Sequence, residues 1–162
     1  MKRLALAAVT ILVFGLAGCG SSNKNPNTPS DITIFTVQLS ALNENPPVTN
    51  AEATARGTAV LTVNKAANTI DFNVSLNSFP AGSVVNIAHI HNAPAGQNAS
   101  VFLSTGLTAG SVTLTNGSGT FSFQQVPATA AQVAAILAAP ANFYFNVHTT
   151  LNGGGAIRGQ LQ

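Results

Sequence analysis

Short runs in which apolar and polar residues alternate fill the chain from residue 32 to its end, and turn residues separate them. The clearest run is TIDFNVSL at 69–76, in which every second residue is apolar. That period is typical of a strand with one face in a core and the other in water. Similar runs predict further strands over 32–39, 57–63, 84–91, 101–103, 110–114, 119–124, 143–149 and 156–161.

Two pairs of neighbouring runs are spaced as β-hairpins. The runs 57–63 and 69–76 are joined by NKAAN at 64–68, which is a connection of hairpin length. The runs 110–114 and 119–124 flank TNGS at 115–118, and Asn-Gly is a strong turn sequence. The pattern therefore predicts antiparallel pairing within each of these two pairs.

One helix interrupts the strands, over 130–138. Thr129 can cap its start, and Gln132 stands three residues on, where it completes a capping box. Pro140 ends the segment. Many short strands with one short inserted helix predict an all-β fold, a single antiparallel β-sandwich or Greek-key barrel.

Residues 1–18 have the pattern of a lipoprotein signal peptide. Lys2 and Arg3 form a charged start, and the apolar run 4–16 is shorter than the ~20 residues of a membrane-spanning helix. The run LAGC at 16–19 resembles a bacterial lipobox, which implies cleavage before Cys19 and acylation of that cysteine. The alternative is an ordinary secretory signal with an incidental cysteine.

Residues 19–31 are interpreted as the lipidated Cys19 and a flexible tether, because GSSNKNPNTPSD at 20–31 is poor in apolar residues. Residues 32–162 then form the β domain. Several acyl chains would hold the protein stably at a lipid bilayer. The expected location is the bacterial cell envelope. Gly20 after the lipid site favours the outer membrane, by resemblance to other lipoproteins.

Charge is scarce in this sequence. Charged residues make up 6%, against roughly 25% in ordinary soluble proteins. The net charge of +2 includes Lys2 and Arg3 in the leader, and from residue 20 onward four basic residues balance four acidic ones. Without a basic patch, there is no electrostatic case for nucleic-acid binding.

All three histidines fall in two of the predicted strands. His89 and His91 are two residues apart in one strand, so their side chains point to the same face. Val85 and Ile87 share that face by the same count, so a cover is expected, and the loop 92–107 is the candidate. His148 lies in the strand 143–149, on the face opposite its apolar residues. If the two strands are close, the three imidazoles gather on the outer face of the sheet.

The alternative is that these histidines are surface or core residues without a special role. Three neutral imidazoles otherwise suit Cu, Zn or Ni, and the affinity order favours Cu(II). Such a site keeps a coordination position open for water or a substrate. No carboxylate is close in sequence, so a backbone carbonyl or Asn146 has to orient the rings. Ligand imidazoles must be neutral, so binding is expected to weaken below about pH 6.5.

Three motifs carry a resemblance to a known family. They are LSALNENPPV at 39–48, AHIHNAPAG at 88–96 and YFNVHTTLNGGGAIRGQL at 144–161. Together they resemble the CHRD domain family, which is common in secreted bacterial proteins, and the likeness covers about residues 33–162. Two positions depart from the family pattern, Asn92 after the His-Ile-His motif and Ala156 in place of an acid that could have paired with Arg158.

The same motifs have a more distant likeness to the copper half of Cu/Zn superoxide dismutases. It implies that His89, His91 and His148 are copper ligands and that Arg158 guides anions to the metal. The alternative for Arg158 is a structural hydrogen-bonding role in the last strand. The fourth, bridging histidine of those enzymes has no match, and their zinc ligands and cysteines are missing too. These departures put dismutase activity in doubt, but they remain compatible with a three-histidine copper site.

Two functions follow from these observations. The first is a lipid-anchored domain that binds copper outside the cytoplasm. The second is a non-catalytic interaction module that binds protein or glycan, which fits the neutral Asn- and Thr-rich surface. A hydrolase has less support, because the mature chain has no free cysteine, no evident paired carboxylates and no serine in a nucleophile elbow.

Overall fold

The computed structural model of the protein describes residues 31–162. The predicted signal peptide, Cys19 and the tether up to residue 30 lie outside the described residues. Within the described range, no helix has the length and apolar character that crossing a membrane requires.

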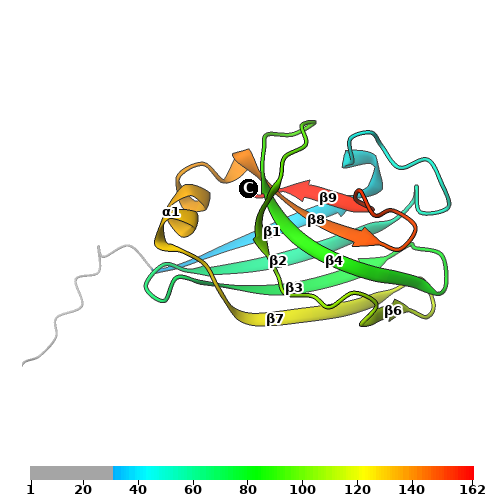
Figure 1. Ribbon diagram of the computed structural model, residues 1–162, viewed down its shortest axis with the longest axis horizontal. Coiled ribbons are helices and arrows are strands. Elements are labelled where there is room, and N and C mark those ends of the chain that lie inside the picture. Colours follow the sequence, from blue (N-terminus) through cyan, green and yellow to red (C-terminus); the bar gives the residue numbers. More distant parts are fainter. Residues whose placement is uncertain (1–30) are drawn as a thin grey trace, which may run out of the picture.

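The described chain forms one curled antiparallel sheet with a single short α-helix, which confirms the predicted all-β class (Figure 1). The strand order is β5-β4-β8-β9-β1-β2-β3-β7, and β6 pairs with β4 beside β5. The strands are β1 Ile32–Ser40, β2 Arg56–Asn64, β3 Thr69–Asn77, β4 Ser83–Asn92, β5 Val101–Ser104, β6 Val112–Leu114, β7 Gly119–Pro127, β8 Phe143–Thr149 and β9 Ile157–Gln160.

The sheet curls around its own hydrophobic core. Phe72 of β3 and Phe145 of β8 stack with ring centroids 5.6 Å apart, although three strands separate β3 from β8 in the sheet order. Alternate residues of β2 and β3, such as Leu61 and Val63, are fully buried, as the alternation of the sequence predicts. The concave face therefore holds the apolar core, and the polar residues of the strands lie on the convex face.

The first predicted hairpin forms and the second does not. β2 and β3 pair along their whole length, from Arg56–Asn77 to Asn64–Thr69. The second prediction is wrong, because β6 pairs with β4, whereas β7 pairs with β3 at the opposite end of the sheet. The turn itself forms, and the Gly117 N–H donates to the Leu114 carbonyl at 3.0 Å. The turn connects β6, at one edge of the curled sheet, to β7, at the other edge. β7 pairs with β3 because the ladder between these two strands is long.

A β-bulge in β4 changes which residues face the core. The pairing of β4 with β8 shifts register between Val85 and Ile87. As a result Val85 belongs to the buried core cluster, together with Ala88 and Ile90. The prediction that Val85 shares the histidine face is therefore wrong, because a bulge adds one residue and reverses the alternation beyond it.

The helix α1, Ala130–Ala138, begins and ends where the sequence predicts. Thr129 accepts a hydrogen bond from the Gln132 N–H, and the Gln132 side chain accepts one from the Thr129 N–H, so the capping box is complete. The Gln132 side chain also donates to the carbonyl of Phe102 in β5 at 2.7 Å. Val133 and Ile136 are buried beneath the helix. Short 3₁₀ turns, η1 Ala41–Asn43 and η2 Pro140–Asn142, complete the regular elements.

Thr129→Ala is expected to lower the free energy of unfolding by about 1 kcal/mol, because it removes the acceptor for an N–H at the helix start. Urea denaturation followed by circular dichroism would measure the change. Thr108→Ala is the matched control, since Thr108 is exposed in a loop and its side chain makes no hydrogen bond within residues 31–162. Its effect should stay within about 0.5 kcal/mol, and equal losses in the two variants would contradict the capping role.

Candidate metal centre

Strand register brings the polar side chains of four strands into one row on the convex face. His89 in β4 lies opposite Asn146 in β8, which lies opposite Arg158 in β9, and Arg158 lies opposite Ser40 in β1. His148 lies opposite Ile87. Ile87 is two residues before His89 in β4, so this pair lies on the same face of the sheet as His89. Directly paired residues share a face, so the register places all three histidines together.

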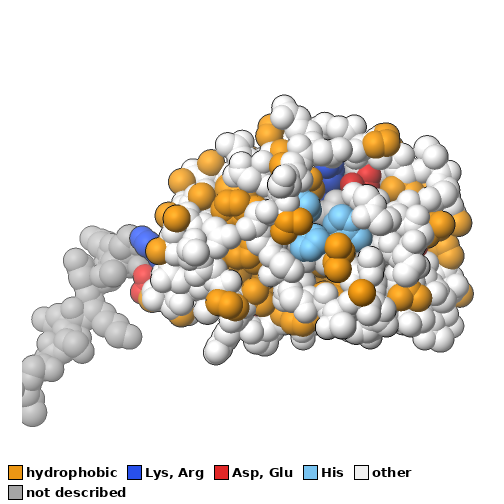
Figure 2. All heavy atoms as spheres, viewed as in Figure 1, with side chains coloured by type: hydrophobic (Ala, Val, Ile, Leu, Met, Phe, Trp, Pro, Cys, Tyr) orange, Lys and Arg blue, Asp and Glu red, His pale blue; other side chains and the backbone are white. Residues whose placement is uncertain are grey.

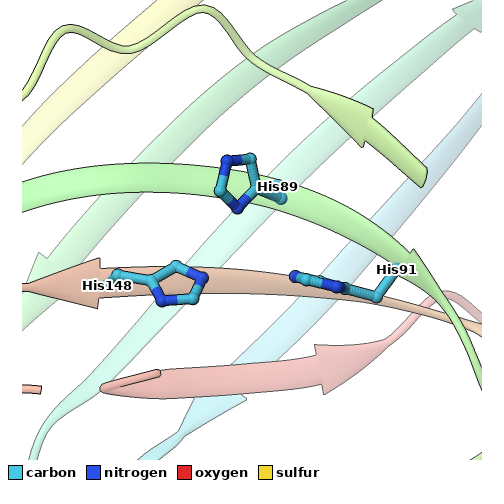
Figure 3. Close-up of side chains that lie close together, drawn as sticks. All are labelled: His89, His91 and His148. Carbon is cyan, nitrogen blue, oxygen red and sulfur yellow. The ribbon is translucent and has the colours of Figure 1, made fainter. Parts of the chain in front are cut away.

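The three imidazoles form one cluster (Figure 3). Ring centroids are 5.3 Å apart for His89 and His148, 5.7 Å for His89 and His91, and 6.3 Å for His91 and His148. Each ring turns one nitrogen toward the space between them (Figure 3). The predicted convergence of the two histidine strands is therefore confirmed: β4 and β8 are direct neighbours.

Backbone carbonyls orient two of the rings, as predicted. The Nδ1 atom of His91 lies 3.0 Å from the Ala99 oxygen, and that of His148 lies 3.0 Å from the Gly153 oxygen. A carbonyl can only accept, so both rings carry their proton on Nδ1 and present Nε2 as a lone-pair donor. Asn146 does not orient a ring, because its side-chain nitrogen donates to Glu44 instead.

Three buried ring nitrogens have no hydrogen-bond partner within residues 31–162. They are Nδ1 of His89, Nε2 of His91 and Nε2 of His148. Buried polar atoms are rarely left unpaired, so a convergent group of three needs an explanation. One metal ion would satisfy all three lone pairs together.

The spacing of the cluster suits one ion after a small closure. One ligand atom from each histidine can be chosen so that all three lie within 4.8 Å of one another. Two bonds of ~2.0–2.1 Å to a common ion place their ligand nitrogens at most about 4.2 Å apart, so the widest pair has to close by at least about 0.6 Å.

The loop between β4 and β5 covers the cluster, which confirms the cover expected from the sequence. Its Ala99 carbonyl meets His91, and its Ala99 N–H donates to the Tyr144 hydroxyl at 3.4 Å. The Tyr144 ring stacks on His91 with centroids 4.8 Å apart and planes 10° apart. Part of the histidine group remains visible from outside, with basic and acidic side-chain atoms beside it (Figure 2). The cluster is therefore enclosed but not sealed.

A second polar contact fixes the loop that reaches His148. Glu52, which is 1% exposed, accepts hydrogen bonds from the Thr149 hydroxyl at 2.7 Å and from the Asn152 side chain at 2.6 Å. The Asn152 N–H also donates to the Thr149 hydroxyl. These bonds hold the loop after β8 in place, so the Gly153 carbonyl remains beside the ring of His148.

Burial keeps the histidines neutral. Burial, together with the smaller effects of the neighbouring His148 and His91, lowers the pKa of His89 from 6.5 to about 4. Burial also lowers the pKa of His91 and of His148, although the carbonyls beside them act in the opposite direction. All three rings are therefore mostly neutral, which is the form that binds metal, at pH 6.5, so the pH at which protons compete is lower than the sequence alone suggests.

Glu44 is a buried carboxylate that the sequence did not point to. It is 7% exposed and accepts hydrogen bonds from the Asn146 side-chain nitrogen at 3.0 and 3.3 Å. Burial raises its pKa from 4.5 to about 7, although Arg158 and the Asn146 hydrogen bond favour the charged form. Gly155 makes the close approach possible, because a Cβ there would lie 2.6 Å from the Glu44 Oε2 atom. Its place in the NENPP motif was the only available hint.

Arg158 is 2% exposed and joins β9 to two loops. Its Nε donates to the Asn43 carbonyl at 2.6 Å and lies 3.9 Å from Glu44. Its Nη1 donates to the Gln97 carbonyl and to the Asn98 side chain. The guanidinium carbon also lies 4.6 Å from the centre of the Tyr144 ring, so Arg158 packs against the residue that supports His91.

The fold and these contacts define a class: an all-β domain whose convex face carries a three-histidine cluster that can hold a metal ion. The family model of the CHRD domain matches residues 35–161, and the chain belongs to that family. No curated protein and no solved structure matches the chain. The likeness to Cu/Zn superoxide dismutases stays a prediction.

Proposed function

We propose that this protein is a lipid-anchored CHRD domain that binds one copper ion through His89, His91 and His148 outside the cytoplasm. The observation that supports it most strongly is the group of three unpaired, buried ring nitrogens that converge on one space. Among the described residues, no protein group pairs with these atoms, and a buried polar atom left unpaired costs about 1–3 kcal/mol.

The ligand chemistry favours copper over other divalent ions. Three neutral imidazoles suit Cu, Zn and Ni, and among these Cu(II) has the highest affinity in the general order. Neither Glu44 nor Glu52 belongs to the histidine cluster, so the ligand set lacks the carboxylate oxygens that Mg²⁺ and Ca²⁺ require. Three protein ligands leave a coordination position open, which suits a domain that takes up and releases its ion.

The proposed anchor depends on the N-terminal sequence. The charged start, the short apolar run and the LAGC motif at 16–19 support acylation of Cys19. The short polar segment that follows would hold the domain close to the bilayer of the bacterial envelope, with the outer membrane favoured.

Copper binding can be tested by titration of the protein with Cu(II), followed by electron spin resonance. The Cys19→Ala variant should be used, so that a free thiol does not compete for the metal. We expect saturation at one Cu(II) per chain and hyperfine splitting from imidazole nitrogens. Binding that never saturates, or a spectrum without nitrogen couplings, would overturn the proposal. A parallel titration with Zn(II) should show weaker binding.

A further inference from the structure

A groove on the convex face lies beside the histidine cluster and is not explained by metal binding. It has a volume of about 620 Å³, within the range of roughly 300–1,000 Å³ that is usual for small-molecule sites. Thr36 and Gln38 of β1 and Gln160 of β9 line it, and the loops that contain Asn43 and Gly96 border it. None of the three histidines lines the groove, so it is a separate site.

The amide side chains of the groove are held in fixed orientations. The side-chain nitrogen of Asn43 donates to the Arg158 carbonyl, and that of Asn45 donates to the Gly96 carbonyl. The side-chain nitrogen of Gln160 donates to carbonyls, of which the Ala141 oxygen is nearest at 2.7 Å. The side-chain oxygens of these three residues accept no hydrogen bond from residues 31–162. The groove therefore presents three amide acceptors whose orientation is already determined.

Donors are available in the same groove. The Gln38 side-chain oxygen accepts from Thr58, so its nitrogen is the end that remains available. Thr36 is exposed and adds a hydroxyl.

The charge and the apolar parts of the lining limit the ligand class further. Arg158 and Glu44 both line the groove, but they are only 2% and 7% exposed, so the groove presents no exposed charge. Three fixed amide oxygens repel anions. Leu42, which is 62% exposed, and Pro47 and Ala95 supply small apolar surfaces at the edges. The ligand should therefore be neutral, rich in hydroxyl groups, and partly covered by C–H groups.

We propose that this groove binds a neutral saccharide. Hydroxyl groups both donate and accept, so they can meet the fixed amide oxygens and the Gln38 and Thr36 donors in the same pose. A bound peptide is less well matched, because peptides usually add to an exposed strand edge, whereas the floor of this groove is the side-chain face of β1 and β9.

The proposal can be tested with the full-length protein on an array of neutral and acidic glycans. The detergent must have no sugar headgroup, since such a headgroup would compete for the groove. We expect retention of one or more neutral glycans, with no loss when a chelator is present, because the histidines lie outside the groove. Retention of acidic glycans alone, of no glycan, or of glycans only with metal would overturn the proposal.

A matched pair of substitutions locates the binding. Thr36→Phe places a large ring on the floor of the groove at an exposed position, so it should weaken the saccharide at least tenfold without unfolding the protein. Thr113→Phe makes the same change at an exposed position of β6, outside the groove, and should leave affinity unchanged. Titration by calorimetry, with the best glycan from the array, would measure both. Equal affinities of the Thr36→Phe variant and the wild type would place the saccharide elsewhere.

Discussion

His148→Ala is expected to weaken Cu(II) binding by more than about 100-fold. Loss of a residue that only orients a ligand typically costs 10–100-fold, and loss of the ligand itself should cost more. His148 is the ligand that β8 contributes, and its removal leaves only the two imidazoles of β4. Competition with a chelator of known affinity, followed by copper absorption, would measure the change.

Asn92→Ala is the control for this substitution. Asn92 is exposed at the end of β4, directly after His91, but it contributes no atom to the histidine cluster. Its copper affinity should match that of the wild type. If His148→Ala and Asn92→Ala bind copper equally well, the ion is not held between β4 and β8, and the three-histidine site is wrong.

The second large effect concerns pH and the stability of the metal-free protein. The folded state holds a proton on Glu44 up to about pH 7, whereas the unfolded chain releases it near 4.5. The stabilisation that protonated Glu44 contributes to the folded state is therefore fully present below pH 4.5 and is lost as the pH rises through 7. The histidines act in the opposite direction, because their lowered pKa values make the unfolded state bind more protons below pH 6.5.

Glu44→Gln separates the two contributions, since the histidines are common to both proteins. A shift from 4.5 to about 7 corresponds to about 3 kcal/mol, so the wild type should lose that much stability relative to the variant between pH 4.5 and 8. Urea denaturation of both proteins across this range would measure the difference. A constant difference across the range would show that Glu44 titrates normally and is not buried as described.

Local patterns predicted the elements of this fold well, because the information lies within a few residues. The strand 143–149 and the helix 130–138 have the bounds expected from alternation and capping. Pairing over a distance was harder to predict. The Asn-Gly turn between β6 and β7 specifies a turn, but the long ladder between β7 and β3 decides the partner. The bulge at Val85 leaves no mark in the apolar pattern, so the residue was placed on the wrong face.

The candidate site was predicted in part for the same reason. His89 and His91 follow from the two-residue period of a strand, and His148 follows from the period of its own strand. Glu44 was missed, because 102 positions of sequence separate it from Asn146 and only the fold brings the two side chains together. The loop that covers the histidines could be predicted, because it follows β4 directly in the chain.

Strand β8 has an unusual position in this sheet, because all seven of its residues are buried. An antiparallel strand ordinarily has one face toward water, and substitutions on that face are well tolerated. In β8 one face packs the apolar core, while the other carries Tyr144, Asn146 and His148 beneath the loops. We therefore expect almost every substitution in β8 to affect either the core or the histidine cluster. A substitution in β8 that alters the histidine cluster must therefore also preserve the folding of the domain.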